Sequence, residues 1–315
     1  MNSSPDSAFD WSTVADEVRF STQGLPLLSL SKPYPGEPNV ENQIGAAEAP
    51  SSISFFRQFH LPMIQSAGLK PEFCRILEIG AGFGQLAYGS LKTIKPELYV
   101  ATDVFPSLVS VLAGNLPKWT DSPVAAAILD PQDPLVFRPQ LFNVIQFHSV
   151  LHHVLDYRRA VRALYDRLAS PGVMILCEPC LDGHLAFLAL IRMFRKHTPL
   201  PEPIATQIRL VEEYILERAG PRRADPEFLR TFGAGDKYLY SIYDLMELAE
   251  DIGARLFVQR DGRSMKENFK FELRLRGGTD RLLEQFDVLL SEVLPEGVEN
   301  AYFSDLRQVF SLRKP

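Results

Sequence analysis

Three glycines at alternate positions follow an apolar run in the segment LEIGAGFG, residues 77–84. Gly80, Gly82 and Gly84 have no side chain, so the backbone here can approach a bound molecule closely. The helix that we expect after the segment begins with unpaired N–H groups. The dinucleotide fingerprint G-x-G-x-x-G would need a glycine where this chain has Gln85, so the spacing argues against a nicotinamide dinucleotide.

Acidic residues stand before the glycine turn and after two later predicted strands. Glu78, two residues before Gly80, would repel a pyrophosphate and suits a ligand with positive charge. S-Adenosylmethionine is such a ligand, because it carries an ammonium and a sulfonium. Asp103 ends the second predicted strand, nineteen residues after Gly84, and Asp130 follows the third. The ligands of a doubly wound sheet bind beyond the carboxyl ends of its strands, which is where these acids fall.

The segment FHSVLHHVLD places three histidines after the fourth predicted strand. Methyl transfer from a sulfonium is an in-line displacement, which needs an acceptor atom held close to the methyl carbon and shielded from water. A hydroxyl acceptor also needs a base with a pKa near neutrality, and histidine fits that need. The candidates for such a base are His152, His148 and Glu178, and the alternative is that no base is used. We expect His153 to pack within the protein.

The elements that must position these residues alternate along the chain. Apolar segments over 75–80, 98–103, 124–130, 142–148 and 172–178 predict buried strands, and helical patterns lie between them. The segments ARLFVQRD (254–261) and NFKFELRLRG (268–277) predict two last strands, the second because its apolar residues alternate. The prediction is therefore an α/β fold: a Rossmann-like, doubly wound, mostly parallel seven-stranded sheet with a helical lid insertion.

The domain organisation follows from composition. Residues 1–50 are rich in proline and predict an irregular arm, residues 51–276 form the core with a helical acceptor lid at 181–240, and residues 277–315 form C-terminal helices, expected over 279–293 and 299–312. Ser241 with Asp244 three residues later predicts the capped start of a helix. We expect that the two C-terminal helices could support a homodimer.

Composition excludes several classes of function. The chain has 315 residues, and 33 basic against 39 acidic side chains give a net charge of −6, so no general nucleic-acid or anionic-membrane surface is expected. Three cysteines, a polar N-terminus and no apolar run long enough to cross a bilayer predict a cytoplasmic protein. The isolated C-E-P-C at 177–180 is a poor zinc motif, and the cluster of His152, His153, Asp156, Glu178 and His184 matches no metal spacing, so no metal is predicted.

The glycine turn resembles motif I, (D/E)-x-G-x-G-x-G, of the class I S-adenosylmethionine-dependent methyltransferases, and the resemblance runs in order over roughly residues 70–276. It implies S-adenosylmethionine as methyl donor, bound at Glu78 and the three glycines, with Asp103 on the ribose hydroxyls and Asp130 near the adenine amino group. The stretch from Phe142 to Pro179 also resembles the family, except that Asn143 replaces an aspartate and Val173 a glycine. His148 lies beside the methyl group in this fold and is expected to contact the donor.

The segment VLHHVLD resembles I-L-H-D-W-S-D of the plant-type small-molecule O-methyltransferases, although the N-terminal dimerisation domain of that group is missing here. The resemblance implies that His152 is the base and that Glu178 orients it. The predicted function is methyl transfer to a small-molecule acceptor, with oxygen favoured over nitrogen or carbon. The alternative is a non-methylating protein that binds S-adenosylmethionine, as a regulatory module or a rearrangement catalyst. No nucleic acid and no membrane partner is expected.

Overall fold

The computed structural model of the chain describes residues 9–14, 18–20, 25–31, 46–133, 137–259, 265–275, 279–293 and 306–314. The chain divides into two compact units. The first comprises Met1–Leu176, Ala249–Phe257 and Phe310–Pro315, and the second comprises Cys177–Leu248 and Val258–Val309. The second unit begins at Cys177, within the strand Gly172–Pro179. It includes the segment 181–240, predicted as a lid, and part of the predicted C-terminal region.

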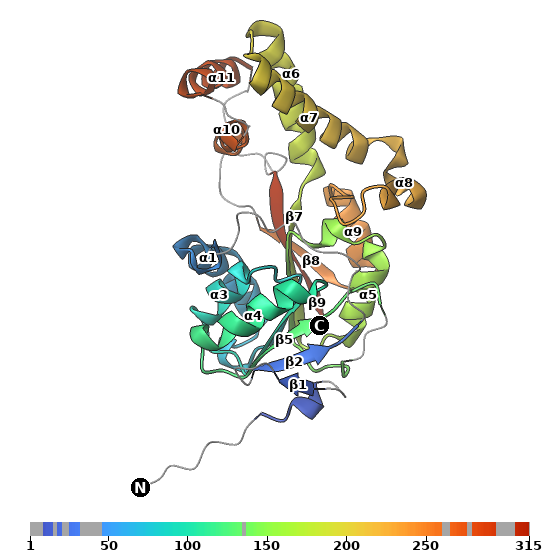
Figure 1. Cartoon of the computed structure of the whole chain (residues 1–315). Helices are drawn as coiled ribbons and strands as arrows, with labels where there is room; N and C mark the ends of the chain where they lie inside the picture. Colours follow the sequence, from blue (N-terminus) through green and yellow to red (C-terminus); the bar gives the residue numbers. More distant parts are fainter. Residues whose placement is uncertain are drawn as a thin grey trace. The chain divides into compact units, whose positions relative to one another are not determined.

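A nine-stranded sheet with the order β1-β2-β5-β4-β3-β6-β7-β9-β8 organises the first unit (Figure 1). Its strands are β1 (Val18–Phe20), β2 (Pro26–Ser29), β3 (Arg75–Ile79), β4 (Leu98–Asp103), β5 (Val124–Ile128), β6 (Val144–His148), β7 (Gly172–Pro179), β8 (Arg255–Gln259) and β9 (Arg307–Lys314). The Rossmann-like α/β class is confirmed, and the prediction of seven strands is wrong. Three strands were not predicted, namely β1 and β2 in the N-terminal arm and β9 near the C-terminus, whereas the strand predicted over 268–277 is absent from the sheet.

The four strands β5, β4, β3 and β6 run parallel and are neighbours in the sheet. Ile76 of β3 pairs with Tyr99 of β4 and with Val144 of β6, which sets the register. The residues of β3 and β4 are buried almost without exception, as expected for strands covered on both faces. Because parallel strands end at one edge, the residues after β3, β4, β5 and β6 are brought together there.

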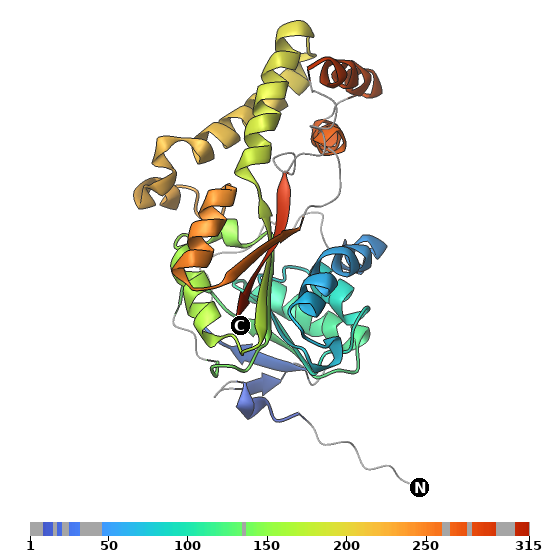
Figure 2. The same cartoon turned by 180° about the vertical axis from the view of Figure 1, so that it is seen from behind.

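Helices cover both faces of this sheet (Figures 1 and 2). One layer contains α1, α3 and α4, and α5 lies on the opposite side. The helices of the chain are α1 (Pro50–Phe55), the π-helix η3 (Phe56–His60), α2 (Leu61–Ser66), α3 (Gln85–Leu91), α4 (Pro106–Trp119), α5 (Tyr157–Arg167), α6 (Leu181–His197), α7 (Glu202–Ala219), α8 (Pro226–Arg230), α9 (Ile242–Asp251), α10 (Met265–Leu275) and α11 (Asp280–Val293).

The N-terminal arm contributes regular structure, which corrects the prediction of an irregular segment over 1–50 as far as it is described. Strand β2 pairs in parallel with β5, and Leu30 N donates a hydrogen bond to Ile128 O at 2.9 Å. Strand β1 pairs antiparallel with β2. The run LPLLSL at 25–30 supplies apolar side chains for this edge, since Leu25, Leu28 and Leu30 are buried. Burial of this run outweighs the prolines that surround it.

The second unit is helical and has an apolar core of its own. Helices α6 and α7 pack together, and α10 and α11 pack together. The side chains of this core come from all four helices and from the segments just before α9 and just before β9, and they include Phe187, Phe194, Ile208, Ile215, Leu239, Leu273, Phe286 and Leu306. The long helices expected within 181–240 are therefore confirmed as α6 and α7.

Two predictions for the C-terminal region are wrong. Residues 268–275 of the segment NFKFELRLRG, which was predicted as a strand, belong to α10. In this helix Lys266 and Lys270 lie one turn apart, and both form ion pairs with Asp287 of α11, at 3.4 and 2.5 Å. The helix predicted over 299–312 falls partly outside the described residues, and its described part is β9. Val309, Phe310 and Leu312 of β9 are buried because the strand lies between β7 and β8. The prediction of a homodimer was based on two C-terminal helices, and the second of them is not a helix in its described part.

In the described part of the chain, no helix has both the length and the apolar character needed to cross a membrane.

Candidate functional site

The glycine turn connects β3 to α3 and has a backbone that side chains would disrupt. Gly80 and Gly84 have φ angles of 65° and 94°, in the left-handed region. A Cβ atom at Gly80 would lie 2.5 Å from Cγ2 of Val150, and one at Gly84 would lie 2.7 Å from the ring of Trp119. These two glycines are therefore required both by their backbone conformation and by close packing.

Gly82 differs from its neighbours because it faces open space. Its φ is 56°, and the nearest atom to a Cβ placed there would be Gln85 Oε1 at 4.0 Å. Nothing in the described chain fills the position in front of this residue, so a ligand can approach the main chain here. The N–H of Gly82 points elsewhere, because it donates to Oδ2 of Asp103 at 3.0 Å.

Asp103, at the end of β4, is the acid that the glycine turn holds. Oδ1 accepts from Phe105 N at 3.1 Å, and Oδ2 accepts from Gly82 N. Each oxygen keeps a second lone pair that can accept a hydroxyl, which is the chemistry that two vicinal ribose hydroxyls require. The side chain is 6% exposed, and burial raises its pKa although the backbone N–H groups oppose this shift. Its assignment to the ribose stays a prediction.

Asp130 lies just after β5, half-buried at the same edge of the sheet. Its Oδ1 accepts from Gln132 N at 2.9 Å, which forms a turn, and its own N–H donates to Oγ of Ser31 at 2.7 Å. Ser31 directly follows the residues that extend β2, so the N-terminal arm helps to fix this turn. Its predicted contact with adenine is likewise untested by the structure.

Glu78, the predicted acid before the turn, is 2% exposed and does not face solvent. The hydroxyl of Tyr99 donates a short hydrogen bond to its Oε2. The pKa of Glu78 is raised to about 8, chiefly by burial; the hydrogen bond from Tyr99 lowers it, and the nearby Asp103 also raises it. A direct contact between Glu78 and a donor therefore stays a prediction.

The histidine segment lies against the glycine turn. His148 ends β6, Val150 packs against Gly80, and the short helix η5 (Leu151–His153) follows. His148 is half-buried with its ring edge-on to Phe55, the ring centroids being 4.7 Å apart. His152 is 6% exposed, and its ring centroid is 4.1 Å from that of His153. The fold thus brings the predicted histidines to the edge of the sheet that carries Asp103 and Asp130.

Glu178 is the one predicted site residue that belongs to the second unit. It lies near the end of β7 and is 1% exposed. Its predicted role in orienting His152 stays a prediction.

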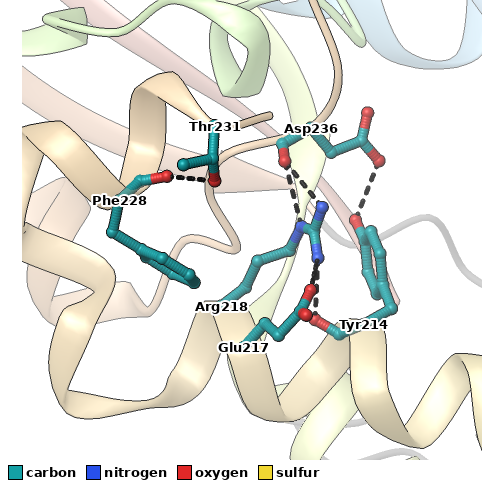
Figure 3. A network of polar contacts seen from close by, with 6 residues as sticks. All are labelled: Tyr214, Glu217, Arg218, Phe228, Thr231 and Asp236. Atoms are coloured by element: carbon teal, nitrogen blue, oxygen red, sulfur yellow. Dashed lines mark hydrogen bonds and ion pairs between the residues drawn. The ribbon is translucent and has the colours of Figure 1, made fainter. Parts of the chain in front are cut away.

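In the second unit, a side-chain clamp holds the loop 231–237 (Figure 3). Arg218 of α7 donates to the main-chain oxygen of Asp236 from Nε at 3.1 Å and from Nη2 at 2.7 Å. Its guanidinium carbon lies 4.0 Å from the ring centroid of Tyr214 and 4.5 Å from that of Phe232. The hydroxyl of Tyr214 donates to Oδ2 of Asp236 at 3.0 Å. A buried arginine with this many partners fixes the loop firmly.

Lys237 completes the clamp from the loop side. Its Nζ donates to Gly233 O at 2.6 Å and to Gly235 O at 3.1 Å, and the side chain is 3% exposed. Burial lowers the pKa of Lys237, although neighbouring Asp236 opposes the shift. The next residues lead into α9, where Ser241 and Asp244 exchange hydrogen bonds with each other's backbone N–H at 2.8 and 3.2 Å. The predicted cap of this helix is confirmed.

The residues at the edge of the sheet fit a donor of the predicted kind. Gly82 leaves the backbone open, and Asp103 offers two acceptor oxygens beside it. Sequence reasoning missed Ser31 and Tyr99, the buried hydrogen-bond partner of Glu78. A signal for Tyr99 existed, since it is a polar residue inside a buried strand.

Residues 77–174 match the model of a family described as a methyltransferase domain. Among curated proteins, probable polyketide synthase 41 of Dictyostelium discoideum is 28% identical over 122 residues, which is 33% of this chain and 5% of that protein. The reducing polyketide synthase Preu2 of Preussia isomera is 30% identical over 112 residues, 35% of this chain and 5% of that protein. The chain thus spans about one twentieth of the length of these relatives.

Two solved structures are also similar. One is phosphoethanolamine N-methyltransferase 2 of Haemonchus contortus in complex with phosphomonomethylethanolamine and S-adenosylhomocysteine, with 19% identity, 82% of this chain and 53% of that chain covered, and a TM-score of 0.49. The other is the [4+2]-cyclase SpnF, with 15% identity, coverage of 90% and 86%, and a TM-score of 0.48. At these values the two structures do not determine the reaction of this chain.

Proposed function

We propose that this chain is a class I S-adenosylmethionine-dependent methyltransferase that transfers the methyl group to an oxygen of a small-molecule acceptor. The observation that carries the proposal is the contact between Val150 and Gly80. This contact holds the segment with His148 and His152 against the glycine turn, so an imidazole lies in the region where the acceptor has to be held.

His152 is the proposed general base. It is buried, so it can act on an acceptor in a region that excludes water, and η5 directly after β6 restricts its position. Bound at Gly82, Asp103 and Asp130, the donor supplies an electrophilic methyl carbon on a positively charged sulfur. His152 takes the hydroxyl proton as the acceptor oxygen attacks, and His148 with Phe55 forms a wall of the region. Glu178 is proposed to orient the base.

The class of acceptor is proposed from the curated relatives. Both are polyketide synthases, so the acceptor panel should contain hydroxylated polyketide-like molecules beside phenols and amines. The net charge of −6 disfavours a nucleic-acid acceptor. A cytoplasmic location and a homodimer remain parts of this proposal.

The test is a comparison of wild type with His152→Ala and His153→Ala in the presence of donor and acceptor panel. Mass spectrometry of the products and the yield of S-adenosylhomocysteine give turnover, and calorimetry gives donor affinity. We expect His152→Ala to lose about 100-fold or more in turnover with donor affinity unchanged, and His153→Ala to retain more turnover. Full turnover in His152→Ala would exclude it as the base.

The pH dependence of that loss separates a base from a structural role. The wild type should lose kcat on the acid side of a histidine pKa, and His152→Ala should not show this limb. Donor binding without any S-adenosylhomocysteine from any acceptor would instead support the alternative of a non-methylating binding protein.

A further inference from the structure

A buried hydrogen-bond chain next to the glycine turn connects residues of three strands and two helices, α3 and η3. Tyr99 of β4 donates to Glu78 of β3, and Nε2 of Gln146 in β6 donates to the Tyr99 oxygen at 2.7 Å and to Ser90 Oγ at 3.4 Å. At its far end, Nδ1 of His60 in η3 lies 3.2 Å from Oε1 of Gln146. Each of these side chains is at most 2% exposed.

The donors and acceptors fix the direction of this chain. The amide oxygen of Gln146 can only accept, so Nδ1 of His60 carries the proton that it donates. The amide nitrogen of Gln146 can only donate, so the single hydroxyl proton of Tyr99 is left for Glu78. The chain therefore holds Oε2 of Glu78 in one place and offers it a hydrogen bond, whichever protonation state the carboxyl has.

The charges around Glu78 favour a neutral acid. In the part of the chain that the structure describes, no lysine or arginine forms an ion pair with it. The titratable groups near Glu78 or near the hydrogen-bond chain are Tyr99 and Asp103 from β4, His60 from η3 and His148 from β6. Burial and the nearby His148 hold the pKa of His60 at about 3, so it stays neutral, while Asp103 repels negative charge.

We propose that Glu78 is a neutral carboxylic acid in the donor-free protein and releases its proton to solvent when the cationic donor binds over the glycine turn. Tyr99, Gln146 and His60 are positioning residues that keep the carboxyl in place for this change. The O–H bond of the acid breaks, the electron pair stays on the carboxylate, and the hydrogen bond from Tyr99 stabilises the anion. The carboxylate then balances one positive charge of the donor without touching solvent.

The inference rests on the proposed placement of the donor at Gly82 and Asp103, and it deepens it. A binding reaction that releases a proton becomes stronger as pH rises, until the free acid is already ionised. Because burial raises the pKa of Glu78 to about 8, the contribution of Glu78 to donor affinity should increase up to roughly pH 8 and level off above it.

The experiment is calorimetric titration of the full chain with S-adenosylmethionine at pH 6–9.5, in buffers that differ in ionisation enthalpy. We expect the proton release that depends on Glu78 to be close to one proton per donor bound at pH 7 and to decline to about zero at pH 9.5. S-Adenosylhomocysteine, whose sulfur is uncharged, should release less. Donor binding with a heat that is independent of buffer at every pH would overturn this inference alone, whereas absence of donor binding would also overturn the donor site.

Variants identify the source of the proton. The donor's own amino group titrates near pH 8, so the informative quantity is the difference between wild type and Glu78→Gln, which should bind donor with little release. Unchanged release in Glu78→Gln would assign the proton elsewhere, for instance to Asp103, and would overturn the proposal.

Tyr99→Phe tests the positioning chain. It removes the hydrogen bond that favours the anion, so the pH at which release is half complete should move upward. Tyr165→Phe is the matched control, because it also loses a buried hydroxyl, which donates to Arg313 O at 3.0 Å away from the chain of Glu78. It should leave proton release unchanged, and an equal shift in both variants would count against the role of Tyr99.

Discussion

The glycine turn of the first unit and the loop 231–237 of the second are both irregular, but different atoms hold them. The turn is fixed through its own main-chain atoms over a short stretch. Ala81 N donates to Thr102 O at 2.6 Å, Gly82 N donates to the carboxylate of Asp103, and Gly80 packs directly on the side chain of Val150. Such contacts depend on the absence of side chains.

The loop 231–237 depends on the presence of side chains. Arg218 lies 18 residues before Asp236, and its guanidinium supplies two of the hydrogen bonds to that carbonyl. Lys237 turns back onto the carbonyls of Gly233 and Gly235. A clamp built in this way can be lost by one substitution while the helices around it remain.

This difference explains why the glycine turn can be predicted from the sequence and the loop 231–237 cannot. A main-chain turn needs particular residues at fixed spacing, so it leaves a short local pattern. A side-chain clamp needs only an arginine at the right place in space, and any of the chain's other arginines has the same appearance in the sequence. The comparison can be tested by breaking each region in turn.

The largest effect is expected at Asp103. Asp103→Ala should weaken donor affinity by about 100-fold or more, because the two charge-assisted hydrogen bonds proposed between Asp103 and the donor would be lost together with the hydrogen bond from Gly82 N. Calorimetry with S-adenosylmethionine measures the change, and Asp121→Ala, at an exposed position, is the matched control. Unchanged affinity in Asp103→Ala would remove this residue from the donor site.

A smaller effect, divided between stability and binding, is expected within the glycine turn. Gly80→Ala should lower the free energy of unfolding by about 2–4 kcal/mol, because a left-handed residue is strained and its Cβ would overlap Val150. Gly82→Ala should cost only the strain, about 1–2 kcal/mol, but should weaken donor binding because the new methyl group occupies the open side. Denaturant unfolding and calorimetry distinguish the two outcomes.

Equal stability losses in the two variants, with no difference in donor binding, would contradict this division. The double variant Gly80→Ala/Val150→Ala offers a further check. Removing the valine side chain should recover the overlap part of the loss but not the strain, and a complete recovery would show that the backbone conformation at residue 80 costs little.

The sequence predicted the parts of the fold that depend on local patterns. The strands β3 to β7 and the acids after them follow from apolar runs and from the family motif, and all five strands are confirmed. The glycine turn and the helix cap at Ser241 are also encoded by short sequence patterns, and the structure contains both. The roles of Asp103, Asp130, His148, His152 and Glu178 could be proposed from the sequence but need binding and turnover measurements.

The parts that could not be predicted depend on tertiary contacts. The alternating apolar residues of 268–277 fit a strand, but Leu273 is buried in the core of the second unit and the basic residues one turn apart meet Asp287. Strand β9 has no alternation because both of its faces are covered. The addition of β2 to the edge beside β5 was missed since the surrounding prolines dominate the local pattern.

The smallest of the three effects is expected at Arg218. Arg218→Lys keeps the charge but loses the paired hydrogen bonds to Asp236 O and the planar contact with Tyr214 and Phe232, so the free energy of unfolding should fall by about 1–2 kcal/mol. Arg222→Lys is the matched control, because that arginine also lies over an aromatic ring but its side chain is 64% exposed, and its loss should be within about 0.5 kcal/mol. Donor affinity should stay within about twofold of wild type in Arg218→Lys, since the clamp and the donor turn belong to different compact units. A larger loss of donor affinity at equal stability would mean that the loop contributes to donor binding. The glycine turn, which its main chain fixes, and the loop 231–237, which side chains hold, would then belong to one site rather than two.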